Sequence, residues 1–143
     1  MRSNPWKSYQ KVAAQTATPC QLVLMLFEGA LRFLEQARAG FAEEDPQLFN
    51  QAINNNIIKA QAIIHELDMS LDLDKGGQFA ETMRALYGYI DRRLQESNLH
   101  KEISGVVECL QRITVLRDAW REMMGQPQGQ SGELQTIALC AAG

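Results

Sequence analysis

The chain has 143 residues, of which 45% are hydrophobic and 22% charged, and its formal net charge is −3. That length supports one domain with its own core, and the slightly negative charge, without any lysine- or arginine-rich block, excludes the electrostatic footprint of a nucleic-acid-binding protein. No stretch approaches the roughly 18 apolar residues of a membrane span, and residues 1–15 lack the apolar region of a secretory signal. We therefore expect a cytoplasmic protein.

The segment 1–17 shows no sustained hydrophobic period and contains Pro5, Trp6 and Tyr9. We predict an amino-terminal arm over these residues. Because Trp6 and Tyr9 are amphipathic aromatic residues, two roles remain open for them. They could fold back over an apolar groove and shield it until a partner binds, or they could pin the arm permanently to the core.

The first helix is predicted over residues 18–40. Thr18 can cap its amino end, Pro19 suits the first helical position, and Gln21 can complete a capping box with Thr18. Gly40 predicts a stop in the left-handed conformation. The apolar stripe of this helix comprises Leu22, Leu26, Gly29, Ala30, Phe33 and Ala37.

The second helix is predicted to begin at Asp45-Pro46, again a capping residue followed by proline, and to end near Leu71. At about 100° per residue, one stripe of apolar residues explains how this helix packs. Its members are Phe49, Ile53, Ile57, Ala60, Ile64, Leu67 and Leu71. Residues 72–77, which end in Gly76-Gly77, are predicted to form a turn.

Two further helices are predicted over residues 78–97 and 102–124, with a brief break at residues 98–101. The inward residues of the third are Phe79, Met83, Leu86, Tyr87, Ile90 and Leu94. Those of the fourth are Ile103, Val106, Val107, Leu110, Ile113, Trp120 and Met124, and Cys109 is interpreted as a buried hydrophobic residue. Gly125 and Pro127 end the fourth helix, and residues 125–143 read as a flexible carboxyl-terminal tail.

Strand signals are lacking, since no alternating apolar run lies between turn clusters. The chain is therefore predicted to be all-α. Helices joined by short connections pack antiparallel to their neighbours, which predicts an antiparallel up-down four-helix bundle over residues 18–124 with a partly ordered amino-terminal arm.

The residue patterns of catalysis and of metal binding are missing. Neither His65 nor His100 follows a glutamate by three residues, as di-iron bundles require, and the three cysteines do not have the spacing of a zinc site. Gly76-Gly77 lacks the lysine and hydroxyl residue of a phosphate-binding loop, and no Gly-x-Ser-x-Gly elbow occurs. We therefore expect a binding protein that is not an enzyme and uses no cofactor or metal.

All four predicted helices carry apolar residues beside their core stripe. A surface helix normally keeps that side polar, so spare apolar surface suggests that another chain binds there. The alternative is that the bundle itself, the arm or the tail covers these residues. They are Leu24, Phe27 and Leu31 on the first helix, Leu48, Ile58, Ala62 and Met69 on the second, Ala85, Gly88 and Tyr89 on the third, and Val115, Ala119 and Met123 on the fourth.

An ordered set of motifs over residues 6–124 resembles the FliS family, the flagellin-specific secretion chaperones of the bacterial flagellum. The chain departs from the family pattern at Phe27-Glu28, where tyrosine and an aspartate or asparagine are common, and at Trp6, which stands where many members have a tyrosine. The matching pieces are Tyr9, Thr18-Pro19, Leu22-Val23-Leu24-Met25-Leu26-Phe27-Glu28-Gly29-Ala30, Phe33-Leu34, Ile57-Ile58-Lys59-Ala60-Gln61-Ala62-Ile63-Ile64-His65-Glu66-Leu67, Leu86-Tyr87-Gly88-Tyr89-Ile90, Arg93-Leu94, Ser97-Asn98 and Arg117-Asp118-Ala119-Trp120.

The resemblance implies a cytoplasmic export chaperone that binds the disordered carboxyl-terminal region of flagellin in apolar surface grooves. Such binding prevents premature polymerisation and keeps flagellin competent for secretion. The implied partners are this flagellin segment and components of the flagellar export gate, with no nucleic acid and no membrane span. The amino-terminal arm is implied to act as a cap that moves when the client binds.

Six residues are predicted to contact the client, namely Tyr9, Ile58, Lys59, Ala62, Ile63 and Tyr89. Lys59 would orient a carboxylate or carbonyl of the client, although an ordinary solvated lysine is equally compatible with the pattern. A second function also remains open, a structural or self-oligomerising bundle whose spare apolar faces form a homo-oligomer interface.

Overall fold

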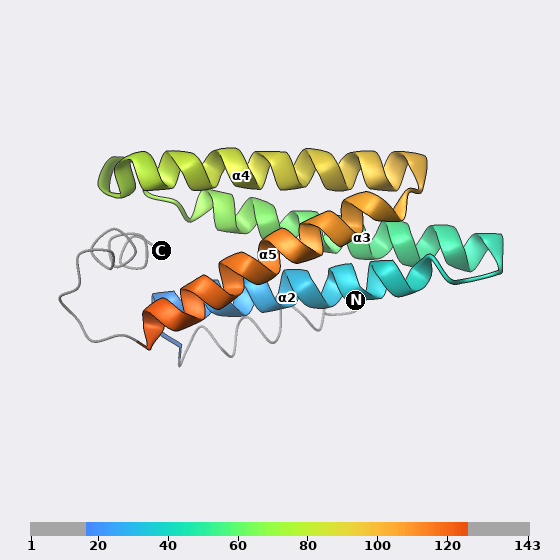
Figure 1. The fold of residues 1–143 in the computed structure, drawn as a ribbon, viewed down its shortest axis with the longest axis horizontal. Helices are drawn as coiled ribbons and strands as arrows, with labels where there is room; N and C mark the ends of the chain where they lie inside the picture. Colours follow the sequence, from blue (N-terminus) through green and yellow to red (C-terminus); the bar gives the residue numbers. More distant parts are fainter. Residues whose placement is uncertain (1–16, 126–143) are drawn as a thin grey trace, which may run out of the picture.

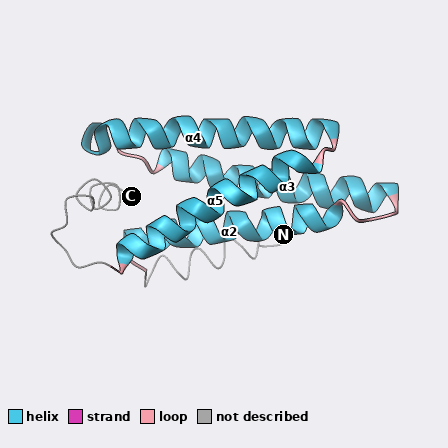
Figure 2. Cartoon of the chain, viewed as in Figure 1, coloured by secondary structure: helices cyan, strands magenta, loops and turns pink. Residues whose placement is uncertain are grey.

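The computed structural model describes residues 17–125, so nearly all of the predicted arm and tail lie outside the described residues. This part of the chain consists of four α-helices, and no strand occurs within it (Figures 1 and 2). The helices are α2 (Pro19–Gly40), α3 (Pro46–Met69), α4 (Leu73–His100) and α5 (Ile103–Met124). The predicted all-α class is confirmed.

Consecutive helices run in opposite directions and are joined by short connections (Figure 1). Packing follows the same order, with α2 on α3, α3 on α4 and α4 on α5, and α5 returns to pack against α2. The slanted course of α5 across the bundle brings its carboxyl-terminal half beside the start of α2 (Figure 1). The result is the antiparallel four-helix bundle that the sequence predicts. None of the described helices has the length and hydropathy needed to cross a membrane.

The predicted helix starts are confirmed at atomic detail. The backbone N–H of Gln21 donates to Thr18 Oγ1 at 3.2 Å, and the Thr18 N–H donates to Gln21 Oε1 at 2.9 Å, which completes the capping box. At the start of α3, Asp45 Oδ1 accepts from the Gln47 N–H at 2.8 Å. Both helices have proline in the first turn, where its missing N–H leaves no bond unmade.

The prediction that Gly40 is a left-handed stop is wrong. Gly40 is the last residue of α2, and Phe41, which follows it, has right-handed helical dihedral angles (φ −66°). The glycine is required for space, because a Cβ atom at this position would lie 2.8 Å from the Ala52 Cβ of α3. Its role is to let the ends of two helices approach closely.

The predicted turn at residues 72–77 forms the first turn of α4. Asp72 Oδ1 caps it by accepting from the N–H groups of Asp74 and Lys75, both at 3.0 Å. Gly77 then kinks the helix with a φ of 54° and a ψ of −135°, which glycine adopts without steric cost. The remainder of α4 continues to His100, beyond the predicted end at Ser97, and Lys101 ends it in the left-handed conformation.

The predicted apolar stripes form most of a single core. Ile53, Ile57 and Ile90 are fully buried, and Cys109 is also buried, as expected. Its thiol donates to the Ile90 carbonyl at 3.8 Å, and burial raises the pKa of the thiol to about 12, which keeps it protonated. Ile103 is an exception, since it begins α5 and is 42% exposed.

The α3–α4 boundary also carries a row of polar pairs, here called the polar seam. On α3 its residues, Asn54, Gln61 and Asp68, recur every seven positions. One partner of each recurs every seven positions in the opposite order on α4, namely Asn98, the backbone carbonyl of Asp91, and Arg84. Such spacing keeps each pair on the facing sides of two antiparallel helices. The layers are Asn54 with Asn98, Gln61 with Asp91 and Gln95, and Asp68 with Arg84.

Candidate functional site

One face of α3 exposes apolar side chains to solvent. Leu48, Ile58 and Met69 are 50%, 51% and 73% exposed, and Ala62 is also exposed. These four residues, here called the α3 outer face, lie opposite the buried stripe of the same helix because of the helical period. The sequence correctly predicts that they do not contribute to the core.

Lys59 lies at the edge of the α3 outer face, next to Ile58. Its side chain is exposed, and its Nζ atom lies 5.5 Å from the centroid of the Phe33 ring of α2. This cation–π contact is worth about 0.5–1 kcal/mol at an exposed site. It holds a positive charge at the boundary of α2 and α3, within reach of a partner that covers Ile58.

Two of the apolar residues that the sequence assigns to spare surface belong to the core. Ile63, one of the six predicted contacts, is 2% exposed, so its assignment to the contact surface is revised. Phe27 is 1% exposed and packs edge-on against Trp120, with 6.1 Å between ring centroids. Both are buried because α2 and α3 each pack against two neighbouring helices, which widens the stripe that must be apolar.

Tyr89 lies on a different side of the bundle, where α4 faces α5. Its hydroxyl donates to Glu108 Oε2 at 2.6 Å, and the Arg112 guanidinium lies 4.9 Å from the ring centroid. Arg93 Nε and Arg112 Nε each donate to a Glu108 oxygen at 2.9 Å. The structure therefore does not bring Tyr89 together with Ile58 and Lys59, and Tyr9 lies outside the described residues.

Hydrogen bonds within this α4–α5 cluster determine the protonation states of Glu108 and Tyr89. The hydrogen bond from Tyr89, followed by those from Arg112 and Arg93, lowers the pKa of Glu108 to about 2. The bond to Glu108 in turn raises the pKa of Tyr89, whose hydroxyl stays protonated and donating. The cluster thus links α4 to α5 by hydrogen bonds. It leaves only part of the Tyr89 ring accessible to a partner.

Additional exposed apolar residues lie near helix ends and on α5. Val115 is 67% exposed, and Ala119 is exposed beside it, as the sequence predicts. Leu99 and Leu73, at 73% and 40% exposure, fall where the sequence predicts a break and a turn, so no helical pattern marks them. These residues enlarge the apolar surface beyond the α3 outer face.

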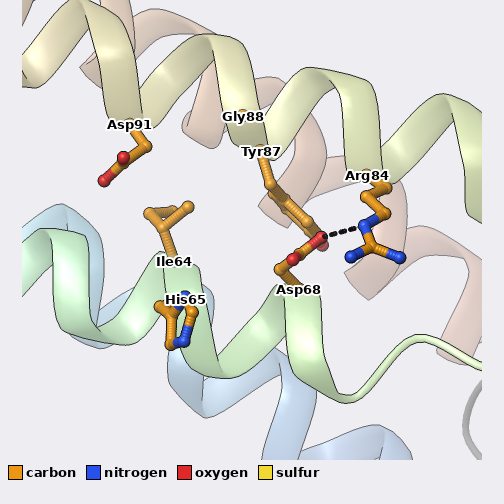
Figure 3. Close-up of a pocket in the computed structure, with 7 residues that line it drawn as sticks. All are labelled: Ile64, His65, Asp68, Arg84, Tyr87, Gly88 and Asp91. Carbon is orange, nitrogen blue, oxygen red and sulfur yellow. Dashed lines mark ion pairs between the residues drawn. The ribbon is translucent and has the colours of Figure 1, made fainter.

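A cavity of about 200 Å³ opens between α3 and α4 (Figure 3). The apolar pattern of the sequence does not indicate it. It lies beside the last layer of the polar seam. The seven-residue recurrence of Asn54, Gln61 and Asp68 marks the α3–α4 boundary in the sequence, but it does not reveal the opening itself. Its lining residues are Ile64, His65, Asp68, Arg84, Tyr87, Gly88 and Asp91.

Metal-ligating residues do not gather in the described part of the chain. Within residues 17–125, no group of three or more histidine, cysteine, aspartate or glutamate side chains is placed to hold a metal ion. The candidate site consists of the exposed apolar side chains of α3, the nearby Lys59 and the polar cavity.

Comparison with known proteins identifies a family over the whole described region. The family model for flagellar protein FliS matches residues 2–127. The flagellar secretion chaperone FliS of Bacillus subtilis (strain 168) is 35% identical over 119 residues, which cover 83% of this chain and 85% of that protein. The proteins of the same name from Escherichia coli (strain K12) and Salmonella typhimurium are 34% and 31% identical, over 80% and 82% of this chain and 82% and 87% of their own lengths.

Proposed function

The chain belongs to the FliS family of flagellar secretion chaperones, and from this membership we propose that it binds the disordered carboxyl-terminal segment of flagellin before export. Bound flagellin is kept from premature polymerisation in the cytoplasm and is later released to components of the export gate. The role is one of binding, without catalysis, cofactor or nucleic acid. In this proposal the α3 outer face and Lys59 contact the client, and Tyr9 of the arm covers the same surface until the client arrives.

The observation that supports this proposal best is the exposure of Leu48, Ile58 and Met69 on a helix whose opposite side is already packed. A segment that folds as it binds typically buries about 1,000–3,000 Å² and loses several kcal/mol to ordering. At roughly 25 cal/mol per Å² of apolar area, a few hundred Å² of apolar contact offset that loss. An exposed apolar face on a preformed helix supplies such contact without reorganising the chaperone.

We expect Ile58→Asp to weaken the binding of flagellin at least tenfold, because a carboxylate would be desolvated beneath the bound client. Ile58 is half-exposed and outside the core, so the free energy of unfolding should change little. The measurement is isothermal titration calorimetry with a synthetic peptide of the last third of the bacterium's own flagellin, accompanied by urea denaturation of each variant.

Gln36→Glu is the matched control, since it adds the same negative charge at an exposed position on α2. It should bind the peptide as the wild type does. Wild-type affinity in Ile58→Asp would show that the α3 outer face is not the binding site. Loss of the cooperative unfolding transition in Ile58→Asp would instead assign Ile58 a structural role.

Self-association is the second candidate function, because the same exposed apolar residues could pack against another copy of the chain. It makes a different prediction for sedimentation in the ultracentrifuge. A chaperone awaiting a client should remain monomeric as its concentration rises. A dimer that disappears in Ile58→Asp would favour the homo-oligomer interface.

A further inference from the structure

We propose that the cavity between α3 and α4, here called the α3–α4 pocket, receives one lysine or arginine side chain of the bound polypeptide, with Asp68 as the accepting carboxylate. The inference rests on the proposed function for the identity of that polypeptide, a flagellin segment. It adds a charged point of recognition to a surface otherwise described by apolar contact. The pocket lies between the two helices and is open to solvent, where a side chain can enter (Figure 3).

In two layers of the polar seam the side chains are joined by a hydrogen bond, and in the third layer they are not. Asn98 Nδ2 donates to Asn54 Oδ1 at 3.0 Å, and Gln61 Nε2 donates to Gln95 Oε1 at 3.2 Å. In the third layer, Arg84 Nε lies 3.9 Å from Asp68 Oδ1, which is beyond hydrogen-bond distance.

Asp68 Oδ1 is therefore an unsatisfied acceptor. The atom is buried, and it has no hydrogen-bond partner among residues 17–125. A buried acceptor without a partner typically costs about 1–3 kcal/mol, and more if it is charged. A donor that reaches this oxygen would recover that free energy on binding.

Tyr87 places a second polar group beside Asp68. Its side chain is 4% exposed and extends from α4 toward the Asp68 carboxylate (Figure 3). Burial, followed by the negative charge of Asp68, raises the pKa of this hydroxyl. The hydroxyl therefore stays neutral, and its oxygen can accept from an N–H group that enters the pocket.

Charge and size together select the occupant. Asp68 and Asp91 contribute two carboxylates to the lining, against one guanidinium from Arg84, so an anion is disfavoured. The volume of about 200 Å³ is below the roughly 300–1,000 Å³ of small-molecule sites. A long side chain with an apolar stem and a cationic end suits the wall formed by Ile64 and the Tyr87 ring, with the charge at Asp68.

Arg84 does not already fill this role. Its side chain is 59% exposed, and its closest approach to Asp68 is the 3.9 Å separation in the third layer. With the Arg84 side chain largely exposed and the separation beyond hydrogen-bond distance, this pair contributes little to stability. An incoming cation that donates directly to Oδ1 would displace a weak interaction with a stronger, charge-assisted one.

The test is titration calorimetry of full-length Asp68→Asn with the flagellin peptide described above. We expect the affinity to fall at least tenfold, while stability to urea stays the same or rises because an unsatisfied carboxylate is removed. Asp74→Asn removes the same charge from an exposed position on α4 and should bind as the wild type does.

A series of peptides, each with one lysine or arginine replaced by glutamine, identifies the occupant. One replacement should weaken binding to the wild type at least tenfold and should have no further effect on Asp68→Asn. Equal effects of every replacement on both proteins would overturn the proposal, because no basic residue would then depend on Asp68.

Two more variants separate recognition from a structural role. Gly88→Leu should fill the pocket and weaken binding similarly, because a Cβ there meets only Arg92 Nη1, at 3.4 Å. Arg84→Gln removes the competing cation and should bind the peptide as tightly as the wild type or more tightly. An equal loss in Arg84→Gln and Asp68→Asn would show that the pair acts only within the chaperone.

The two proposals fail in distinguishable ways. If Ile58→Asp weakens binding while Asp68→Asn and Gly88→Leu bind normally, only the pocket proposal is wrong. If the wild-type protein does not bind the flagellin peptide, the proposed function is wrong, and the pocket proposal is rejected with it.

Discussion

At the scale of single residues, Glu108 shows how one carboxylate can hold two helices together. It is the common acceptor for Tyr89 and Arg93 of α4 and for Arg112 of its own helix, and these bonds lower its pKa to about 2. Its folded-state pKa lies below the ordinary value of 4.5, so protonation favours the unfolded chain. The stabilisation is therefore complete above about pH 5 and is lost as the pH falls from 4.5 toward 2.

We expect Glu108→Gln to lower the free energy of unfolding at pH 7 by about 1 kcal/mol, since the side chain is 26% exposed and its pairs are partly screened. The difference from the wild type should shrink steadily between pH 5 and pH 2. Urea denaturation at several pH values measures it, with Glu122→Gln, at an exposed position on α5, as the control. A difference that does not depend on pH would contradict the assigned cause.

The candidate site shows which residue properties can be predicted from sequence. The period of α3 correctly places Leu48, Ile58 and Met69 outside the core. The same period misplaces Ile63, because the width of the buried stripe depends on how many helices surround α3. The opening at Asp68 could not be predicted, since it depends on a separation of a few ångströms between two helices.

At the scale of helices, two helical glycines have different roles. A Cβ at Gly105 of α5 would lie 2.8 Å from the Ser97 Cβ and 2.9 Å from the Arg93 carbonyl oxygen of α4. A Cβ at Gly88 would meet only the flexible end of Arg92, at 3.4 Å. The first glycine allows the close approach of α4 and α5, and the second lines the α3–α4 pocket.

Gly105→Ala should therefore destabilise the bundle by about 1–3 kcal/mol, because the clash outweighs the gain in helix propensity of about 1 kcal/mol. Gly88→Ala should be neutral or stabilising by up to about 1 kcal/mol. Denaturant unfolding of the two variants side by side checks the contrast. A stabilising effect in both would show that α4 and α5 can separate at little cost.

The sequence predicts helix boundaries correctly where local chemistry decides them. The caps at Thr18 and Asp45 depend on neighbours within three residues, and both form as predicted. The glycine at position 40 and the extension of α4 past Ser97 depend on other parts of the chain. Gly40 approaches Ala52 of the neighbouring helix α3, and the Ser97 hydroxyl donates to the Glu102 carbonyl oxygen across the connection to α5.

At the scale of the whole molecule, contacts between α5 and α2 close the bundle. Trp120 Nε1 donates to the Cys20 carbonyl oxygen at 3.0 Å, and the Trp120 ring packs edge-on against Phe27. Arg121 adds an ion pair with Glu28 at 2.8 Å. These contacts join residues about a hundred positions apart, so they unite the first and last described helices into one core.

Trp120→Leu should lower the free energy of unfolding by about 2–4 kcal/mol, through lost packing and the lost hydrogen bond to the Cys20 carbonyl. Trp120→Phe keeps an aromatic ring beside Phe27 and should lose less. Thermal unfolding followed by circular dichroism should show a single transition in each variant. Two separate transitions would mean that α5 unfolds independently of the other three helices.

The seven-residue spacing of the polar seam also dictates how α3 and α4 must align lengthwise. If α4 slipped by seven residues, Asp68 would face the kink at Gly77, Gln61 would face Arg84, and Asn54 would face Asp91. The apolar stripes would still meet, since a heptad shift nearly restores the helical phase. The observed alignment joins Asn54 to Asn98 and Gln61 to Gln95 by amide–amide hydrogen bonds. These two layers therefore favour one alignment among several that hydrophobic packing alone leaves close in free energy.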